Sequence, residues 1–130
     1  MRYLIDTQIL IWLFGLTNNI PNNIHKILKD TKNEIFVSSV SIWEIAIKKS
    51  VGKLTFPFEL KNIINEIKKL NISILDISSQ HLIKVADLPF HHKDPFDRLL
   101  IWQAIQRNLV IISKDRKFSH FESFGLKLFW

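Results

Sequence analysis

Short apolar runs alternate with longer segments of helical periodicity along this chain. The runs that read as strands are residues 2–6, 34–38, 72–75 and 109–113, followed by the C-terminal stretch GLKLFW as a fifth, edge strand. The segments between them predict helices at 8–14, from Pro21 onward, and at 41–49, 57–70, 79–86 and 95–107. Because strands that alternate with helices form a parallel sheet covered on both faces, the pattern predicts one three-layer α/β domain spanning residues 1–130.

Composition narrows the class of protein. A chain of 130 residues with 47% hydrophobic and 23% charged residues is a globular domain rather than a disordered one. It has no cysteine, which excludes disulfides and thiolate metal sites and fits a reducing compartment. The apolar stretch 9–16 is too short to span a bilayer, so we expect a cytoplasmic protein without a membrane partner.

Four carboxylates follow predicted strands or begin predicted helices. Asp6 ends the first strand, Glu44 lies in the first turn of the helix after the second strand, Asp97 lies in the first turn of the helix at 95–107, and Asp115 follows the fourth strand. In an open parallel sheet the ligand crevice lies at the carboxyl ends of the strands, so all four are candidates for one site. Clustered carboxylates suit Mg²⁺ or Mn²⁺, which can activate water for phosphodiester hydrolysis.

Each acid also has a structural explanation. Ser41 and Glu44 match a capping box, and Asp94 followed by Pro95 matches a helix start that would place Asp97 favourably in the helix dipole. Such caps explain an acid at a helix start, but they do not explain why the candidates converge on one edge. Thr7 and Ser113 carry hydroxyls beside the acids, either as caps or as partners of a metal-bound water or phosphate.

A net charge of +6 favours a polyanionic partner such as nucleic acid. The basic residues nearest the acids are candidates for holding a nucleic-acid backbone; they are Lys48, Lys49, Lys93, Arg98, Lys114, Arg116 and Lys117. The four tryptophans are interpreted as core residues, because three of them lie within apolar helical periodicity. The chain has neither a Gly-rich phosphate loop nor a GxSxG elbow, which argues against nucleotide cofactors and acyl-transfer hydrolysis.

Four motifs occur in an order that resembles the PIN-domain family, and more closely its VapC-type toxin ribonucleases of type II toxin–antitoxin systems. They are LIDT at 4–7, SIWEIAIK at 41–48, HKDPFDRLLIWQA at 92–104 and SKD at 113–115. Position 8 departs from the pattern, since it is Gln where many relatives have His or Asn.

The resemblance implies a PIN-like fold with a five-stranded parallel sheet and a Mg²⁺- or Mn²⁺-dependent endoribonuclease. It also implies a homodimer that a cognate antitoxin protein neutralises. Carried onto this chain, the catalytic and metal-binding acids are Asp6, Glu44, Asp97 and Asp115, while Asp94 shapes the site and Ser113 supports it. Two alternatives stay open: a non-catalytic PIN-like module that binds RNA or protein, and a DNA nuclease with the same chemistry.

Overall fold

Five strands form one sheet in which every neighbouring pair runs parallel. The computed structural model describes residues 1–16, 19–89 and 94–130. The strands are β1 (Arg2–Ile5), β2 (Glu34–Ser38), β3 (Ser73–Leu75), β4 (Val110–Ile112) and β5 (Lys127–Phe129). Their order across the sheet is β3-β2-β1-β4-β5, with parallel pairing throughout. The predicted α/β fold with a five-stranded parallel sheet is confirmed, and β5 lies at an edge as expected.

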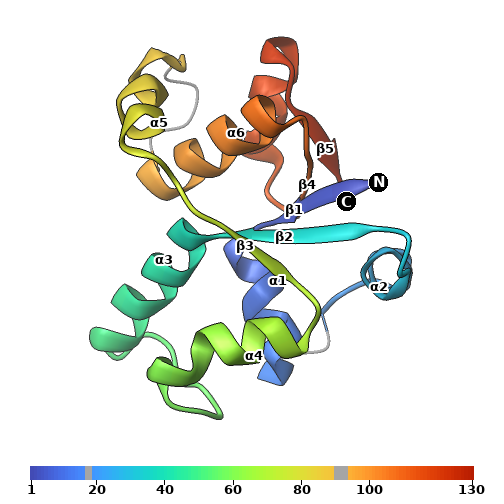
Figure 1. Ribbon diagram of the computed structural model, residues 1–130, viewed down its shortest axis with the longest axis vertical. Coiled ribbons are helices and arrows are strands. Elements are labelled where there is room, and N and C mark those ends of the chain that lie inside the picture. The colour runs from blue at the N-terminus through green and yellow to red at the C-terminus, as the bar shows by residue number, and fades with distance from the viewer. Residues whose placement is uncertain (17–18, 90–93) are drawn as a thin grey trace.

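Helices cover both faces of this sheet (Figure 1). The α-helices are α1 (Thr7–Ile11), α2 (Asn22–Lys29), α3 (Ser39–Ser50), α4 (Ile63–Lys69), α5 (Ser79–Lys84) and α6 (Pro95–Arg107). Shorter helical segments are η1 (Trp12–Leu16), η2 (Leu60–Asn62), η3 (Val85–Asp87) and η4 (Arg116–Phe124). None of the helices in the described part of the chain is both long and apolar enough to cross a bilayer.

Alternating side chains of the strands build two separate cores. Ile5 of β1 is fully buried with residues of α1, α2, α3 and α4 on one face, including Ile9 and Ile45. Leu4, the neighbouring residue, is fully buried on the other face with Leu100 of α6 and with residues of η4. Because successive strand residues point to opposite faces, one short apolar run supplies both layers. The result is the three-layer arrangement visible in Figure 1.

The carboxyl ends of β1, β2 and β4 meet at one edge of the sheet. The Asp6 backbone N–H donates to the Ile112 carbonyl over 3.2 Å, so the residues that follow β1 and β4 start side by side. α3 begins directly after β2, and it also contacts α6. Four separate segments of the chain therefore converge at this edge, as the crevice rule requires.

Two helix starts differ from the sequence prediction. α3 begins at Ser39, where the Ser38 side chain accepts from the Val40 N–H over 3.0 Å, so the predicted capping box of Ser41 and Glu44 is wrong. Glu44 consequently lies in the second turn of α3 rather than the first. α1 is capped by Asp6 and not by Thr7, because the Asp6 side chain accepts from the Ile9 N–H. By contrast, Asp94 caps α6 and Pro95 begins it, as predicted.

Two apolar features are less buried than their periodicity indicates. The segment at 57–70 forms only η2 and α4, and its Ile64 is 48% exposed. The interpretation of all tryptophans as core residues is wrong for Trp43 and Trp130, whose exposed fractions are 59% and 39%. Apolar spacing shows that a residue can pack inward, but the neighbouring elements decide whether anything covers it.

Candidate active site

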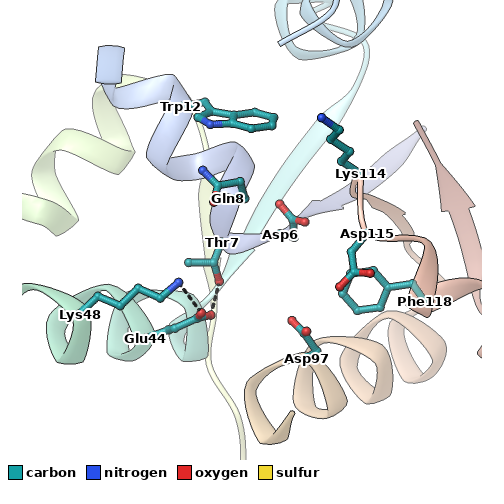
Figure 2. Close-up of a pocket in the computed structure, with 10 residues that line it drawn as sticks. All are labelled: Asp6, Thr7, Gln8, Trp12, Glu44, Lys48, Asp97, Lys114, Asp115 and Phe118. Carbon is teal, nitrogen blue, oxygen red and sulfur yellow. Dashed lines mark hydrogen bonds and ion pairs between the residues drawn. The ribbon is translucent and has the colours of Figure 1, made fainter. Parts of the chain in front are cut away.

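Asp6, Glu44, Asp97 and Asp115 all line one cavity of about 390 Å³ (Figure 2). They come from the end of β1, from α3, from α6 and from the loop after β4. The other residues that line this cavity are Thr7, Gln8, Trp12, Lys48, Lys114 and Phe118. The structure thus brings together the four acids that the sequence indicated, at the predicted edge of the sheet.

Asp6 is the most deeply placed of the four acids. Its side chain is 8% exposed, and its two oxygens accept from the Ile9 N–H, over 2.9 Å, and from the Ser113 hydroxyl. Burial raises the pKa of Asp6 to about 6; the two hydrogen bonds oppose this shift, while the negative charges of Asp115 and Glu44 add to it. Asp6 is therefore a carboxylate held in one orientation, in a place where its charge is unfavourable without a cation.

Asp97 lies in the first turn of α6 and faces the other three acids across the cavity (Figure 2). Burial, as the largest cause, and the nearby charges of Asp94, Glu44, Asp115 and Asp6 together raise the pKa of Asp97 to about 7. Each of these four acids disfavours the ionised form of Asp97, so the negative charges repel one another within one site. Such mutual repulsion is relieved either by protons or by a cation.

Glu44 is held by a polar chain that starts in the core. The Thr7 Oγ1 atom lies 2.8 Å from Glu44 Oε1 and 2.9 Å from Ser41 Oγ. Because a hydroxyl carries one proton, Thr7 donates to the carboxylate and accepts from Ser41. The other oxygen, Glu44 Oε2, pairs with Lys48 Nζ at 3.0 Å. Both oxygens are thus fixed by partners that leave the carboxylate at the cavity wall.

Asp115 is placed by the turn that follows β4. Its Oδ1 atom accepts from the Lys117 N–H over 2.9 Å and so caps η4. Its own N–H donates to Ser113 Oγ over 3.0 Å. Ser113 is buried, and it links the two acids because its hydroxyl donates to Asp6 and accepts from the Asp115 backbone. The predicted supporting role of Ser113 thus takes the form of positioning from behind the cavity, which it does not line.

The basic candidates do not all lie at the cavity. Lys48 and Lys114 line the cavity, and Arg116 is exposed at the start of η4. Lys93 lies outside the described residues, as do the two histidines at positions 91 and 92 that precede it.

Arg98 does not lie on the predicted nucleic-acid surface. It is 7% exposed, and its guanidinium donates to the backbone carbonyls of Val85, Leu88 and Pro89 over 2.8–3.1 Å. A guanidinium engaged in this way inside the protein is not available to a phosphate. Its role is to fasten the segment before α6 to that helix.

Asp94 supports the site rather than entering it. Its Oδ1 atom accepts from the N–H groups of Phe96 and Asp97 over 2.9 and 3.2 Å, which fixes the first turn of α6. Asp94 does not line the cavity. Its negative charge nevertheless raises the pKa of Asp97.

The donor set fits a hard divalent cation. Across the described residues, no three or more acidic or histidine side chains are close enough to hold one ion as they stand. Mg²⁺ usually takes only one or two carboxylates, with waters and substrate phosphate as its remaining ligands. The cavity offers all-oxygen donors whose charges repel one another, and a cation would remove that repulsion. Asp6 and Asp97, the two acids with raised pKa values, gain most from it.

Sequence reasoning missed Gln8, Trp12 and Phe118 as cavity residues. A signal for the first two was present, because Gln8 and Trp12 are four residues apart and therefore share one helix face. That face follows directly from Asp6 at the end of β1. No comparable pattern marks Phe118, which reaches the cavity from η4.

Lowering the pH should stabilise the metal-free protein. The unfolded chain releases protons from Asp6 and Asp97 near pH 3.9, whereas the folded protein holds them up to about pH 6 and 7. Stability from these groups is therefore full below about pH 4 and lost as the pH rises through 6 to 7. Because Asp97 is only partly buried, solvent screening reduces the gain, and we expect about 2 kcal/mol between pH 8 and pH 5.5. That corresponds to a rise in Tm of about 5–10 °C.

Thermal unfolding in EDTA at the two pH values measures this rise. The matched control is the double variant Asp6→Asn/Asp97→Asn, which should lose most of it. An equal rise in both proteins would assign the pH effect to groups outside the cavity.

Comparisons with known proteins show which family and which solved structures this chain resembles. The model of a family described as the PIN domain matches residues 3–123. VapBC2 from Rickettsia felis, bound to a promoter DNA fragment, is 21% identical with a TM-score of 0.70, over 100% of this chain and 99% of that chain. DNA-bound VapBC from Salmonella typhimurium is 17% identical with a TM-score of 0.68, over 99% and 97%.

VapBC-5 from Mycobacterium tuberculosis, a member of the VapBC family of toxin–antitoxin systems, is 12% identical with a TM-score of 0.64, over 98% of this chain and 96% of that chain. At these identities the likeness shows a shared fold. The comparison with curated proteins found no match.

Proposed function

The chain belongs to the PIN domain family, and from this premise we propose that it is a metal-dependent endoribonuclease. One observation carries the proposal: four carboxylates from four segments line a single cavity, and burial and mutual repulsion raise the pKa values of two of them. Caps alone would explain each acid separately. They would not explain a shared cavity in which ionisation is costly without a cation.

We assign Asp6 and Asp97 as ligands of the cation, and Glu44 and Asp115 as further ligands that would bind it directly or through water. A bound Mg²⁺ or Mn²⁺ would lower the pKa of a water molecule and stabilise charge on the phosphate. Ser113 and the Ile9 N–H hold Asp6 in place, and Thr7 and Lys48 orient Glu44. Lys114, on the opposite wall from Gln8, supplies a positive charge for the RNA backbone (Figure 2).

We further propose that the protein is the toxin of a type II toxin–antitoxin pair, active in the cytoplasm as a homodimer. The support is the family, the PIN-domain motifs and the fold shared with proteins from VapBC complexes. The net charge of +6 suits an RNA substrate.

Removal of metal is the direct test of the enzyme. Purified protein should cleave single-stranded RNA in Mg²⁺ or Mn²⁺. EDTA should reduce the rate at least about 100-fold, because in the proposed mechanism the metal lowers the pKa of the attacking water. Gel assays with RNA and with DNA of the same sequence, each with and without EDTA, measure this. Cleavage that persists in EDTA would remove the metal from the mechanism, and preferential cleavage of DNA would change the substrate.

The toxin role has an independent test. Expression of the chain should arrest bacterial growth, and co-expression of a small protein encoded beside it should restore growth. Colony counts after induction measure both effects. Harmless expression together with active RNA cleavage in vitro would leave the nuclease and remove the toxin.

A non-catalytic binding module is the second candidate, and the N-cap that Asp6 supplies to α1 favours it. In that case Asp6 would serve stability alone. Asparagine caps helices as well as aspartate does and carries no charge, so Asp6→Asn separates the two. A wild-type protein that binds RNA without cleaving it, together with unchanged RNA binding by the Asp6→Asn protein, would support the binding module.

A further inference from the structure

Trp12 contributes an aromatic surface to the wall of the acidic cavity. It is the first residue of η1 and only partly buried, and it lines the cavity together with the four acids. Figure 2 shows its indole ring above Gln8, on the side of the cavity opposite Lys114. Trp12 and Phe118 are the two aromatic residues in a lining that otherwise consists of charged and polar groups.

Packing fixes the Trp12 ring in place. It packs against the core that also contains Ile9 and Leu10. Trp130 lies beside it, with ring centroids 6.2 Å apart and an interplanar angle of 51°. The Trp12 ring is therefore a rigid surface. Because its side chain is already ordered, stacking of a ligand on the ring would cost little side-chain entropy.

Gln8 and Lys114 flank this ring with groups that suit a nucleotide. Gln8 is exposed, and its amide has both a donor and an acceptor for the edge of a base. Lys114 is exposed on the opposite wall and can pair with a phosphate. Aromatic ring, amide and ammonium group thus border the place where the acids would act on one phosphodiester.

We propose that Trp12 is a stacking platform for an unpaired nucleobase next to the scissile phosphate of a single-stranded RNA. This rests on the proposed endoribonuclease function and adds a preference for unstacked, unpaired nucleotides. Every base has an aromatic face, so stacking holds a strand with little sequence preference. A base within a duplex is already stacked on its neighbours and is not offered to the ring.

Binding measurements with Trp12 variants test the platform. In the Asp97→Asn background with Mg²⁺, Trp12→Leu should raise the Kd for a labelled single-stranded RNA of mixed sequence by about 10- to 100-fold. Trp12→Phe keeps an aromatic ring and should change the Kd by less than about 3-fold, and it serves if Trp12→Leu folds poorly. The matched control is Phe124→Leu, which removes an aromatic side chain that is 46% exposed and does not line the cavity.

A second oligomer of the same length with abasic riboses separates stacking from backbone contacts. Trp12→Leu should not weaken binding of this abasic oligomer. Equal binding of RNA by the Trp12→Leu and parent proteins would overturn the platform, as would an equal loss on both oligomers. Cleavage of RNA by the wild-type protein is scored separately, so that an active enzyme with no Trp12 effect rejects only the platform, whereas an inactive one rejects the proposed function as well.

Discussion

Asp97→Asn should abolish RNA cleavage while leaving the protein at least as stable as the wild type. The substitution removes a carboxylate that the proposed cation needs, so the rate should fall at least about 100-fold. Asp97 lines the cavity, and its charged form is disfavoured by burial and by four neighbouring acids. Neutral asparagine relieves that repulsion, so Tm at pH 8 without metal should be unchanged or higher.

Initial cleavage rates and melting curves measured on the same preparation check both parts. Asp87→Asn is the matched control, because Asp87 is exposed and lies outside the cavity, and it should keep full activity. A fall in Tm of more than about 5 °C in Asp97→Asn would indicate a structural acid. Full activity would show that the cavity does not need this carboxylate.

The fold was accessible from sequence because its signals are local and agree with one another. The strand predicted at residues 34–38 has the observed bounds of β2, because a short apolar run between polar residues is the local signal of a buried strand. The start of α6 followed from the order of Asp94 and Pro95, which specifies a cap by stereochemistry alone. The convergence of the acids then followed from topology, because parallel strands end at one edge.

The errors arose where distant contacts decide the outcome. Ser41 and Glu44 have the spacing of a capping box, but the chain turns into α3 immediately after β2 and Ser38 takes the cap. Glu44 instead accepts a hydrogen bond from the hydroxyl of Thr7, which lies 37 residues away in the chain. Trp12 has the spacing of a core residue, yet one side of it lines the cavity.

Arg98 is the clearest of these cases, because no sequence pattern distinguishes a buried arginine from one that contacts a phosphate. Its burial depends on the carbonyls of Val85, Leu88 and Pro89, which η3 and the residues after it turn toward α6. These three acceptors need a planar group with several donors, and guanidinium has five. Neither lysine nor methionine can replace it.

Arg98→Met should therefore destabilise the fold by about 3 kcal/mol, because it leaves buried carbonyls without donors. For a domain of this size that lowers Tm by about 10 °C. Arg98→Lys should recover only part of the loss, since a single ammonium group cannot reach three carbonyls in this geometry. Arg116→Met is the matched control: Arg116 is exposed, and its replacement should change the free energy of unfolding by less than about 0.5 kcal/mol.

Urea unfolding of the four proteins measures the differences. Because Arg98 adjoins Asp97, its loss should also loosen the first turn of α6, so RNA cleavage should fall in Arg98→Met even at temperatures where the protein stays folded. A stable and fully active Arg98→Met protein would mean that the contacts from Val85 to Pro89 do not hold the site together. A stable Arg98→Met protein with weakened RNA binding would instead indicate that Arg98 contacts RNA, as the sequence predicted.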